Sequence, residues 1–402
     1  MRESITIVGA SLAGIRGAEA LRRDGFDGPI TLIGEEPHRP YDRPPLSKQL
    51  LAGDVEPADI ALVPDDRYAE LDLDLRLGER ASALDPGSRR LTLESGDVLD
   101  YDGLMIATGA RPRTLAGSEN LAGVHVLRTL DHAVELRRAL SADPTRVVVV
   151  GAGFIGAEVA ATARERGLAV TMIDPLATPM GRVLGDEIGG VCADVHREHE
   201  VDLRMGVGVE SIIGSERVEA VRLSDGTEVS ADVVVVGIGV VPNTEWLDGS
   251  GLTIDNGVVC DETCLAAPDV TAAGDVARWP NPRFGETMRV EHWDNAVEQG
   301  AAAARRLLTD AAAAEPFAPV PWFWSDQYDR KLQLAGRAAP DDEQLLVTGS
   351  HEERRFATIF GRAGSIVGVF GMNRPRHVMQ YRGLIADGAS WDEAVAFGQD
   401  QS

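Results

Sequence analysis

The sequence predicts an α/β protein with two related parallel-sheet domains, one inserted in the other, and a C-terminal α+β domain. A glycine-rich turn occurs twice, at residues 5–14 (ITIVGASLAG) and 147–156 (VVVVGAGFIG). Each turn follows a β-branched run and leads into an Ala-rich helical stretch. This order of strand, turn and helix suits a dinucleotide, whose pyrophosphate rests on the glycines and the helix N-terminus. The repeat therefore predicts two Rossmann-like dinucleotide-binding domains, and so a redox relay.

An acidic residue follows each turn at the distance that such domains require. Glu35 follows the apolar run 30–34, and Asp174 ends the run 169–174. A carboxylate about 20 residues after the turn accepts hydrogen bonds from ribose hydroxyls. One such turn alone also fits an ordinary β-turn-α unit, but two turns with both acids in place favour nucleotide binding.

The remaining elements also repeat and give the domain order. A hairpin at 91–99 precedes a buried strand at 103–107, and a hairpin from 218 precedes a strand at 232–236. After Pro242 the chain returns to short strands and a long helix from about Trp293, so the second unit is inserted in the first. A linker rich in Ala and Pro follows at 311–321. Short strand-like runs to about Met372 and a helix near 391–397 then predict an α+β domain. The predicted domains are residues 1–112 with 243–316, residues 113–242, and residues 317–402.

Composition narrows the function. The net charge of −25 argues against nucleic acid as a partner. No run is apolar and long enough to span a bilayer, and the first strand begins too early for a signal peptide. We therefore expect a cytoplasmic protein that does not associate with a membrane. The only cysteines, Cys192, Cys260 and Cys264, suggest no disulfide framework. Neither a metal-ligand cluster nor a Ser-His-Asp set is evident.

A group of motifs points to one family. These are residues 39–48 (RPYDRPPLSK), 107–109 (ATG), 273–275 (AGD), 289–293 (RVEHW) and 324–328 (WSDQY). With them the chain closely resembles the FAD-dependent NADH:ferredoxin reductases, which serve bacterial cytochrome P450 and ring-hydroxylating dioxygenase systems. The resemblance covers the whole chain and implies a glutathione-reductase-like fold. It also implies that NADH gives hydride to FAD, and that single electrons pass to a ferredoxin.

The resemblance assigns FAD to the first domain. Gly9, Ala13 and Gly14 are expected at the pyrophosphate and Glu35 at the adenosine ribose. Ser11 stands where the glycine pattern usually has its second Gly. Because serine is small and can donate to phosphate, FAD binding is expected to survive this departure.

Further FAD contacts come from other segments of the motif set. Arg43 and Lys48, in a loop stiffened by proline, are expected to place cations beside the flavin, although Arg43 also fits an ion pair or a phosphate contact. Asp275 is expected near the ribityl chain, although a plain helix N-cap would look similar. The resemblance adds Ala81, Ala107, Thr108, Gly109, Arg128, Gly274, Glu291, His292 and Trp293, the last at the isoalloxazine edge.

The resemblance assigns the nicotinamide cofactor to the second domain. Asp174 is expected to bind both ribose hydroxyls and to repel a 2′-phosphate, so NADH is expected over NADPH, with Arg182 as a possible phosphate contact. Glu158 is expected to meet the nicotinamide amide and to pair with Lys48, although a solvated acid at a helix start is the plainer alternative. The cradle and its surroundings are Gly151, Gly153, Phe154, Ile155, Gly156, Gly237, Ile238 and Gly239.

The C-terminal domain is expected to serve dimerisation and docking, in a monomer or homodimer. Trp324 is expected to cover the flavin and join the docking face, or else to be a core aromatic. With Lys48 and Glu158 it completes the expected catalytic set. Residues 317–402 hold eleven acidic and nine basic residues, so this domain is nearly neutral. The basic residues Arg330, Lys331, Arg374, Arg376 and Arg382 are a candidate docking patch for a ferredoxin, or solvated surface.

Other functions of the same plan stay open. A flavoprotein disulfide reductase needs a cysteine pair beside the flavin, yet no cysteine precedes Cys192, and we interpret Cys260 and Cys264 as packing residues. A peroxidase or oxidase that uses a flavin-site cysteine fails for the same reason. Another NADH-dependent flavin reductase or oxidase, or an NADH-sensing protein like apoptosis-inducing factor, remains an alternative.

Overall fold

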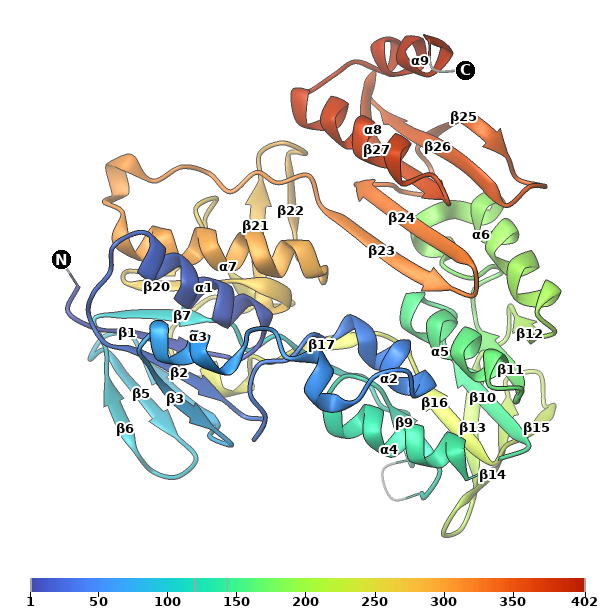
Figure 1. Ribbon diagram of the computed structural model, residues 1–402, viewed down its shortest axis with the longest axis horizontal. Coiled ribbons are helices and arrows are strands. Elements are labelled where there is room, and N and C mark those ends of the chain that lie inside the picture. Colours follow the sequence, from blue (N-terminus) through green and yellow to red (C-terminus); the bar gives the residue numbers. More distant parts are fainter. Residues whose placement is uncertain (1, 119–120, 143, 401–402) are drawn as a thin grey trace. The chain divides into compact units, whose positions relative to one another are not determined.

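The computed structural model describes residues 2–118, 121–142 and 144–400 (Figure 1). The chain forms two compact units. The first unit comprises Met1–Asp42, Ala61–Arg111 and Val241–Trp322, and the second comprises Arg43–Ile60, Pro112–Val240 and Phe323–Ser402. This division follows packing, and the boundaries of the three predicted domains stay a prediction. Residues 1, 119–120, 143 and 401–402, which those domains include, lie outside the described residues.

The first unit contains a mainly parallel sheet with the strand order β19-β20-β7-β1-β2-β3. The neighbouring strands from β20 to β3 pair in parallel, whereas β19 is antiparallel to β20. All four residues of β1 are buried, Thr6 included, so its apolar residues do not alternate with exposed polar ones. The strands are β1 (Ile5–Val8), β2 (Ile30–Gly34), β3 (Leu73–Leu77), β7 (Gly103–Ile106), β19 (Leu265–Ala267) and β20 (Val270–Ala272).

Helices α1 (Leu12–Arg23) and α7 (Trp293–Leu308) pack against each other on one face of this sheet (Figure 1). Their backbones approach closely, since a Cβ on Gly300 would lie 2.4 Å from the carbonyl oxygen of Ala13. The opposite face is covered by small sheets around the fully buried Trp279. The other elements of this unit are α3 (Asp65–Glu70), β4 (Ala81–Asp85), β5 (Arg90–Leu93), β6 (Val98–Asp100), β18 (Val258–Val259), β21 (Ala277–Asn281) and β22 (Glu286–Met288).

The second unit repeats the parallel plan with the order β12-β11-β10-β16-β9. Helices α4 and α5 share a core with one face, and the sheet β13-β14-β15 shares a core with the other. The elements are α2 (Gln49–Ala52), α4 (Leu130–Ser141), α5 (Phe154–Glu165), β9 (Val124–Val126), β10 (Arg146–Val150), β11 (Ala169–Asp174), β12 (Asp202–Met205), β13 (Val209–Gly214), β14 (Val218–Leu223), β15 (Glu228–Ser230) and β16 (Val233–Val236). β8 (Ala110–Pro112) and β17 (Val240–Pro242) lie where the chain passes between the units.

The C-terminal part of the second unit is an antiparallel sheet, β23-β24-β27-β26-β25, as the α+β prediction requires. Helix α6 (Gly181–Glu198) packs on it, with Leu184 and Ile188 in one core with Phe356 and Phe360. This shared core explains why the inserted domain and the C-terminal part form one unit. The strands are β23 (Trp322–Gln327), β24 (Arg330–Gly336), β25 (Glu343–Ser350), β26 (Arg355–Arg362) and β27 (Ser365–Met372).

One helix of this part was not predicted. Besides α9 (Trp391–Asp400), which matches the expected helix near 391–397, the structure contains α8 (Pro375–Asp387). The signals were present in the sequence. Proline stands in its first turn, Val378, Tyr381 and Ile385 are buried at helical spacing, and Gly388 caps its end in the left-handed conformation.

Candidate functional site

The first glycine turn is closed to side chains at two positions. Gly9 has φ +125°, and a Cβ there would lie 2.1 Å from the carbonyl oxygen of Ala107. A Cβ on Gly14 would lie 2.0 Å from the carbonyl oxygen of Gly9. Ser11, by contrast, has an ordinary φ of −128° as N-cap of α1, so serine needs no glycine conformation there. The backbone therefore keeps the tight turn that a pyrophosphate requires, and Ser11 does not disturb it.

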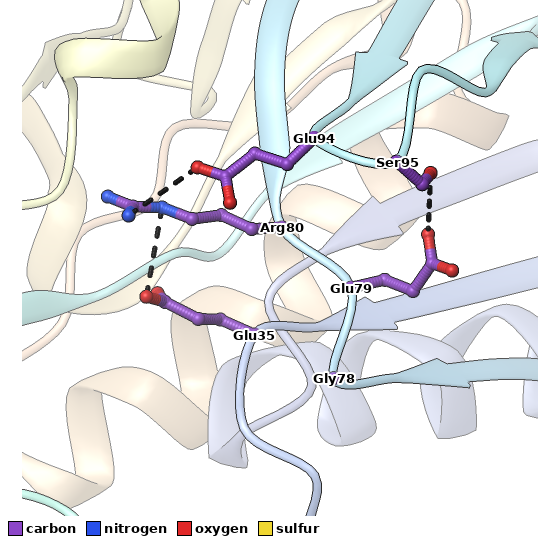
Figure 2. A pocket seen from close by; sticks show the side chains of 6 residues that line it. All are labelled: Glu35, Gly78, Glu79, Arg80, Glu94 and Ser95. Atoms are coloured by element: carbon purple, nitrogen blue, oxygen red, sulfur yellow. Dashed lines mark hydrogen bonds and ion pairs between the residues drawn. The ribbon is translucent and has the colours of Figure 1, made fainter.

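The predicted ribose acid of this turn lies at a surface pocket (Figure 2). Glu35 follows β2, and its side chain is 62% exposed. Arg80 lies between two carboxylates, with its Nε 3.7 Å from Glu35 and its Nη1 3.6 Å from Glu94. Sequence reasoning missed Arg80, which no motif marks. The pocket, of about 370 Å³, is lined by Glu35, Gly78, Glu79, Arg80, Glu94 and Ser95.

Two other segments of the first unit, predicted to contact FAD, are held by residues that the sequence analysis did not single out. The Thr108 hydroxyl donates to the carbonyl of Asn243 (2.9 Å), and the Asn243 amide donates back to the carbonyl of Thr108 (2.9 Å). Gly274 has φ +74°, and its N–H donates to Oε1 of the buried Gln299 (2.9 Å). These bonds fix the loops after β7 and β20, where parallel strands end and ligands of such sheets bind.

The segment 289–293 is also tied to its surroundings. Arg289 donates through Nη1 to the carbonyl of Asp275 (3.0 Å) and lies 2.8 Å from Glu291. Trp293 opens α7, and its Nε1 donates to Asp42 (2.8 Å). Asp275 lies in a short 3-10 turn, not at the start of an α-helix. The other predicted residues are His292, which is the N-cap of α7, Gly109, which has φ +66°, and Ala81 and Ala107, which are buried.

The second glycine turn has the same closed positions. Gly151 has φ +103°, and a Cβ there would lie 2.3 Å from the carbonyl oxygen of Gly237. A Cβ on Gly156 would lie 2.0 Å from the carbonyl oxygen of Gly151. Around Gly153, the N-cap of α5, no heavy atom lies within 4 Å of such a Cβ. The space that a phosphate needs is therefore open at the helix N-terminus.

The acid of the second unit is already engaged with the turn. Asp174 accepts hydrogen bonds from the N–H of Ala152 (2.7 Å) and from the N–H of Leu176 (2.8 Å). Next to the turn, Ile155 and Ile238 are 48% and 36% exposed. Gly239 has φ +96°. Arg182 is exposed on the first turn of α6. The ring of Phe154 packs edge-on against that of Phe323, with the ring centroids 4.4 Å apart.

A buried cluster surrounds Glu158, which is only 3% exposed. Lys48 Nζ lies 2.9 Å from Glu158 Oε2, and Ser47 donates to the same oxygen at 2.5 Å. Ser325 donates to Glu158 Oε1 at 2.7 Å. Thr162, one turn along α5, donates to the carbonyl of Ser47 (2.9 Å) and holds the loop. Glu158 is thus not a solvated helix-start acid. Ser47 and Ser325 stand inside the motifs 39–48 and 324–328, but their role was missed because a serine by itself does not indicate a partner so distant in the sequence.

The remaining predicted residues of the second unit lie on the loop and on β23. Arg43 donates to the carbonyl oxygen of Arg128 at 2.5 Å, so two residues far apart in the sequence meet. Trp324 is half-buried on β23, and Lys331 on the next strand pairs with Asp326 (2.6 Å). The roles of these residues at a cofactor stay predictions.

The cysteines do not form a redox centre. Cys192, Cys260 and Cys264 are buried free thiols. Burial raises the pKa of Cys192 and of Cys264 to about 12, and it raises the pKa of Cys260 as well. Because the thiolate is the reactive form, none of these thiols is poised for disulfide exchange. The alternative of a disulfide reductase therefore lacks its catalytic pair.

Two searches of the described residues bear on other classes of site. Across residues 2–118, 121–142 and 144–400, no cluster of His, Cys, Asp and Glu side chains could hold a metal ion. Over the same residues, no helix combines the length and the apolar character needed to cross a membrane.

Comparison with known proteins identifies the class. Residues 3–300 match the family described as pyridine nucleotide-disulphide oxidoreductase, and residues 322–402 match the family described as reductase C-terminal. The predicted family is confirmed: the chain belongs to the FAD-dependent NADH:ferredoxin reductases within the pyridine nucleotide-disulphide oxidoreductases.

Particular relatives cover almost the whole chain. Rhodocoxin reductase of Rhodococcus erythropolis is 40% identical, over 95% of this chain and 89% of the relative. The ferredoxin–NAD(+) reductase component of the anthranilate 1,2-dioxygenase system of Burkholderia cepacia is 40% identical, over 97% and 96%. The crystal structure of a covalent putidaredoxin reductase–putidaredoxin complex aligns with a TM-score of 0.91 and 35% identity, over 96% and 93%. The predicted fold class is confirmed by these matches.

Proposed function

We propose that this protein is a flavoprotein reductase that takes hydride from NADH onto FAD and passes single electrons to a ferredoxin. The ferredoxin would serve a cytochrome P450 or a ring-hydroxylating oxygenase in the cytoplasm. Relatives named as ferredoxin–NAD(+) reductase components, and a solved complex of a similar reductase with putidaredoxin, support this proposal.

The observation that carries the proposal is the pair of closed glycine turns in a chain without a reactive thiol. Gly9 and Gly151 occupy left-handed backbone conformations against a neighbouring carbonyl, so each turn can present backbone N–H groups to a pyrophosphate. The residues present therefore fit FAD in the first unit, held by Gly9, Gly14 and Glu35, and NADH in the second, held by Gly151 and Asp174.

The chemistry that bound FAD supplies is the conversion of a two-electron hydride donor into one-electron transfers. The residues of the chain bind and orient. Asp174 places a negative charge where NADPH would carry its 2′-phosphate, and this favours NADH. Glu158 and Lys48 present a fixed carboxylate and ammonium to the carboxamide of the nicotinamide. The exposed Ile155 and Ile238 offer apolar surface that NADH would cover, which excludes water from the ring.

Docking of the ferredoxin is assigned to the basic residues at the start of α8. Burial, and then the charges of Arg374, Arg376 and Arg355, lower the pKa of His377, so these side chains lie close enough to act on one another. Cations at a helix N-terminus oppose the helix dipole, and this local cost suits a surface kept for an acidic partner. The predicted Arg330 and Lys331 contribute less, because they pair with Asp329 (3.0 Å) and Asp326 (2.6 Å).

The proposal is tested first by colour and then by electron transfer. The purified protein should be yellow, NADH should bleach it without oxygen, and ferredoxins from the same genome should then reduce cytochrome c. A folded but colourless protein would contradict FAD binding. Bleaching with a long-lived charge-transfer complex, but slow turnover with every acceptor, would favour an NADH-sensing protein instead.

The docking surface is tested by salt and by charge removal. Arg376→Ala should slow ferredoxin reduction at low salt by roughly threefold to tenfold, and the difference should shrink as salt screens the charges. Reduction of ferricyanide by NADH, which needs no docking, should not change. Arg90→Ala, at an exposed position on β5 of the first unit, is the matched control. Equal slowing with both acceptors would remove Arg376 from the docking surface.

A further inference from the structure

The Glu158 carboxylate joins segments of the second unit that lie far apart in the sequence. It comes from the first turn and a half of α5, and it meets the loop residues Ser47 and Lys48 and the strand residue Ser325. Its two oxygens are held from different sides, because Ser47 and Lys48 donate to Oε2 whereas Ser325 donates to Oε1. A shift of β23 would therefore move one oxygen of the carboxylate directly.

Ser325 is itself oriented. Its side chain is fully buried (0% exposed), and Gln327 Nε2 donates to its oxygen at 3.1 Å. A serine hydroxyl has a single proton, and the donor from Gln327 leaves that proton to point at Glu158. The hydrogen bonds therefore run from Gln327 through Ser325 to Glu158, and from there to Ser47 and Lys48. A continuous line of polar groups thus connects β23 with α5 and the Lys48 loop.

The alternation of β23 connects this line to the predicted catalytic tryptophan. Ser325 and Gln327 are two residues apart and are both buried, so they share the inner face of the strand. Trp324 and Asp326 are half-buried and belong to the other face. Anchoring the inner face at Glu158 therefore sets the position of Trp324 along the strand.

Stability alone does not explain this arrangement. A buried ion pair with its hydrogen bonds is usually no more stabilising than apolar residues of similar volume, because charges lose hydration when they are buried. What such a cluster supplies is fixed geometry, provided that every member has a partner. The Glu158 carboxylate meets this condition, since both of its oxygens have donors from the chain.

We propose that Ser325 is a positioning residue for NADH-dependent reduction: its hydroxyl, oriented by Gln327, holds Glu158 for Lys48 and locks the strand that carries Trp324. This inference rests on the proposed function for its kinetic consequence, but the structural lock stands independently of it. Ser325 acts through Glu158, whereas the adenosine half of NADH depends on Asp174, and this difference makes the two roles separable.

The test compares Ser325→Ala with Ser365→Ala, a matched control at an exposed strand serine of the same sheet. Hydrogen–deuterium exchange of the peptide 322–327, measured without NADH, should speed up by about tenfold in Ser325→Ala and stay unchanged in the control. With NADH and ferricyanide, the limiting rate of flavin reduction should fall by roughly tenfold. The affinity for ADP-ribose, which reports the Asp174 end alone, should not change.

A second variant separates positioning from general loosening. Gln327→Ala keeps the Ser325 hydroxyl, and it should change the exchange rate and the reduction rate in the same directions by roughly threefold. The double variant should be no worse than Ser325→Ala alone, because Gln327 acts through Ser325. If Ser325→Ala does not fold, Gln327→Ala carries the same test. Weakened ADP-ribose binding together with the slower rate would mean that the whole unit has loosened, and this would overturn the proposal.

Two further outcomes are distinguishable. Wild-type exchange and a wild-type reduction rate in Ser325→Ala would refute the positioning role while leaving the proposed function intact. A wild-type protein that binds flavin but never accepts electrons from NADH would refute the proposed function. The hydrogen–deuterium exchange comparison alone would then test whether Ser325 holds β23 in place.

Discussion

The two acids that we propose as nucleotide ligands lie at the carboxyl ends of equivalent strands, yet they are held in different ways. Asp174 is half-buried and already bound to the backbone N–H groups of Ala152 and Leu176, at 2.7 and 2.8 Å. Glu35 is 62% exposed and meets only the guanidinium of Arg80 at 3.7 Å among the contacts that the structure defines for it. The shorter side chain is thus preorganised against its own glycine turn, whereas the longer one lies largely exposed at its pocket beside Arg80 (Figure 2).

This difference teaches that a shared motif can be rigid in one copy and adaptable in the other. NADH must bind, and its oxidised product must leave, in every turnover. An acid that is already fixed lowers the entropy cost of ordering the binding site each time. A cofactor that stays bound requires the acid to be ordered only once, when the cofactor first binds. The glycine turns themselves leave equally little room for a side chain in both units. The fold thus requires the closed turns, whereas the ligand determines how firmly each acid is held.

The largest effect is expected where the two turns are alike. Gly9→Ala and Gly151→Ala should each cost about 3 kcal/mol or more, because a Cβ would combine a disfavoured φ with overlap on a carbonyl oxygen. Gly153→Ser, which copies Ser11 into the open position, should stay within about 0.5 kcal/mol. Denaturant unfolding measures both. A tolerated Gly151→Ala would show that the turn is not closed as described.

Acid should act on the second unit through His196. Burial lowers the pKa of this fully buried side chain from 6.5 to about 4. Between pH 6.5 and pH 4 the histidine is protonated in the unfolded chain but stays neutral in the folded chain. The free energy of unfolding is therefore highest above pH 6.5 and falls as the pH drops toward 4. The loss should reach about 3 kcal/mol. Unfolding of the wild type and of His196→Gln between pH 7 and pH 4 measures it, and parallel curves for the two proteins would contradict the assignment.

Removal of the rigid acid should affect substrate binding directly. Asp174→Ala should raise KM for NADH by about tenfold, or about 1.4 kcal/mol, because the ribose hydroxyls lose their acceptor and the turn loses a hydrogen bond. Steady-state kinetics with ferricyanide measures this change. Asp202→Ala, at an exposed position on the neighbouring strand, should leave KM unchanged. An unaltered KM in Asp174→Ala would remove this residue from the binding site.

Removal of the adaptable acid should have the smallest effect. Glu35→Ala should weaken FAD retention by only about 0.5 kcal/mol, because an exposed carboxylate beside Arg80 gains little in water. Fluorescence titration of the apoprotein with FAD measures the change, and Glu94→Ala controls for release of the arginine. A loss as large as that of Asp174→Ala on NADH would abolish the contrast between the two acids.

The sequence by itself determined the parts that depend on local chemistry. Two β-branched runs, their glycine turns and their acids predicted both parallel sheets, because such turns require residues without a Cβ and the acids follow at fixed spacing. The helix α8 was not predicted, although its proline, apolar spacing and terminal glycine are visible in the sequence directly after the strand-like runs that end at about Met372.

Only the tertiary structure decided which distant side chains meet. Ser325 lies 167 positions from Glu158 in the chain, and Arg80 approaches Glu35 from the loop between β3 and β4. Ser325 stands inside the motif 324–328, but nothing in that motif indicates that its hydroxyl completes a buried carboxylate, because this role arises from the desolvation of its partner. The turns could therefore be predicted from residues 5–14 and 147–156 alone, whereas the rigid and adaptable behaviour of their acids depends on what the folded chain places around them.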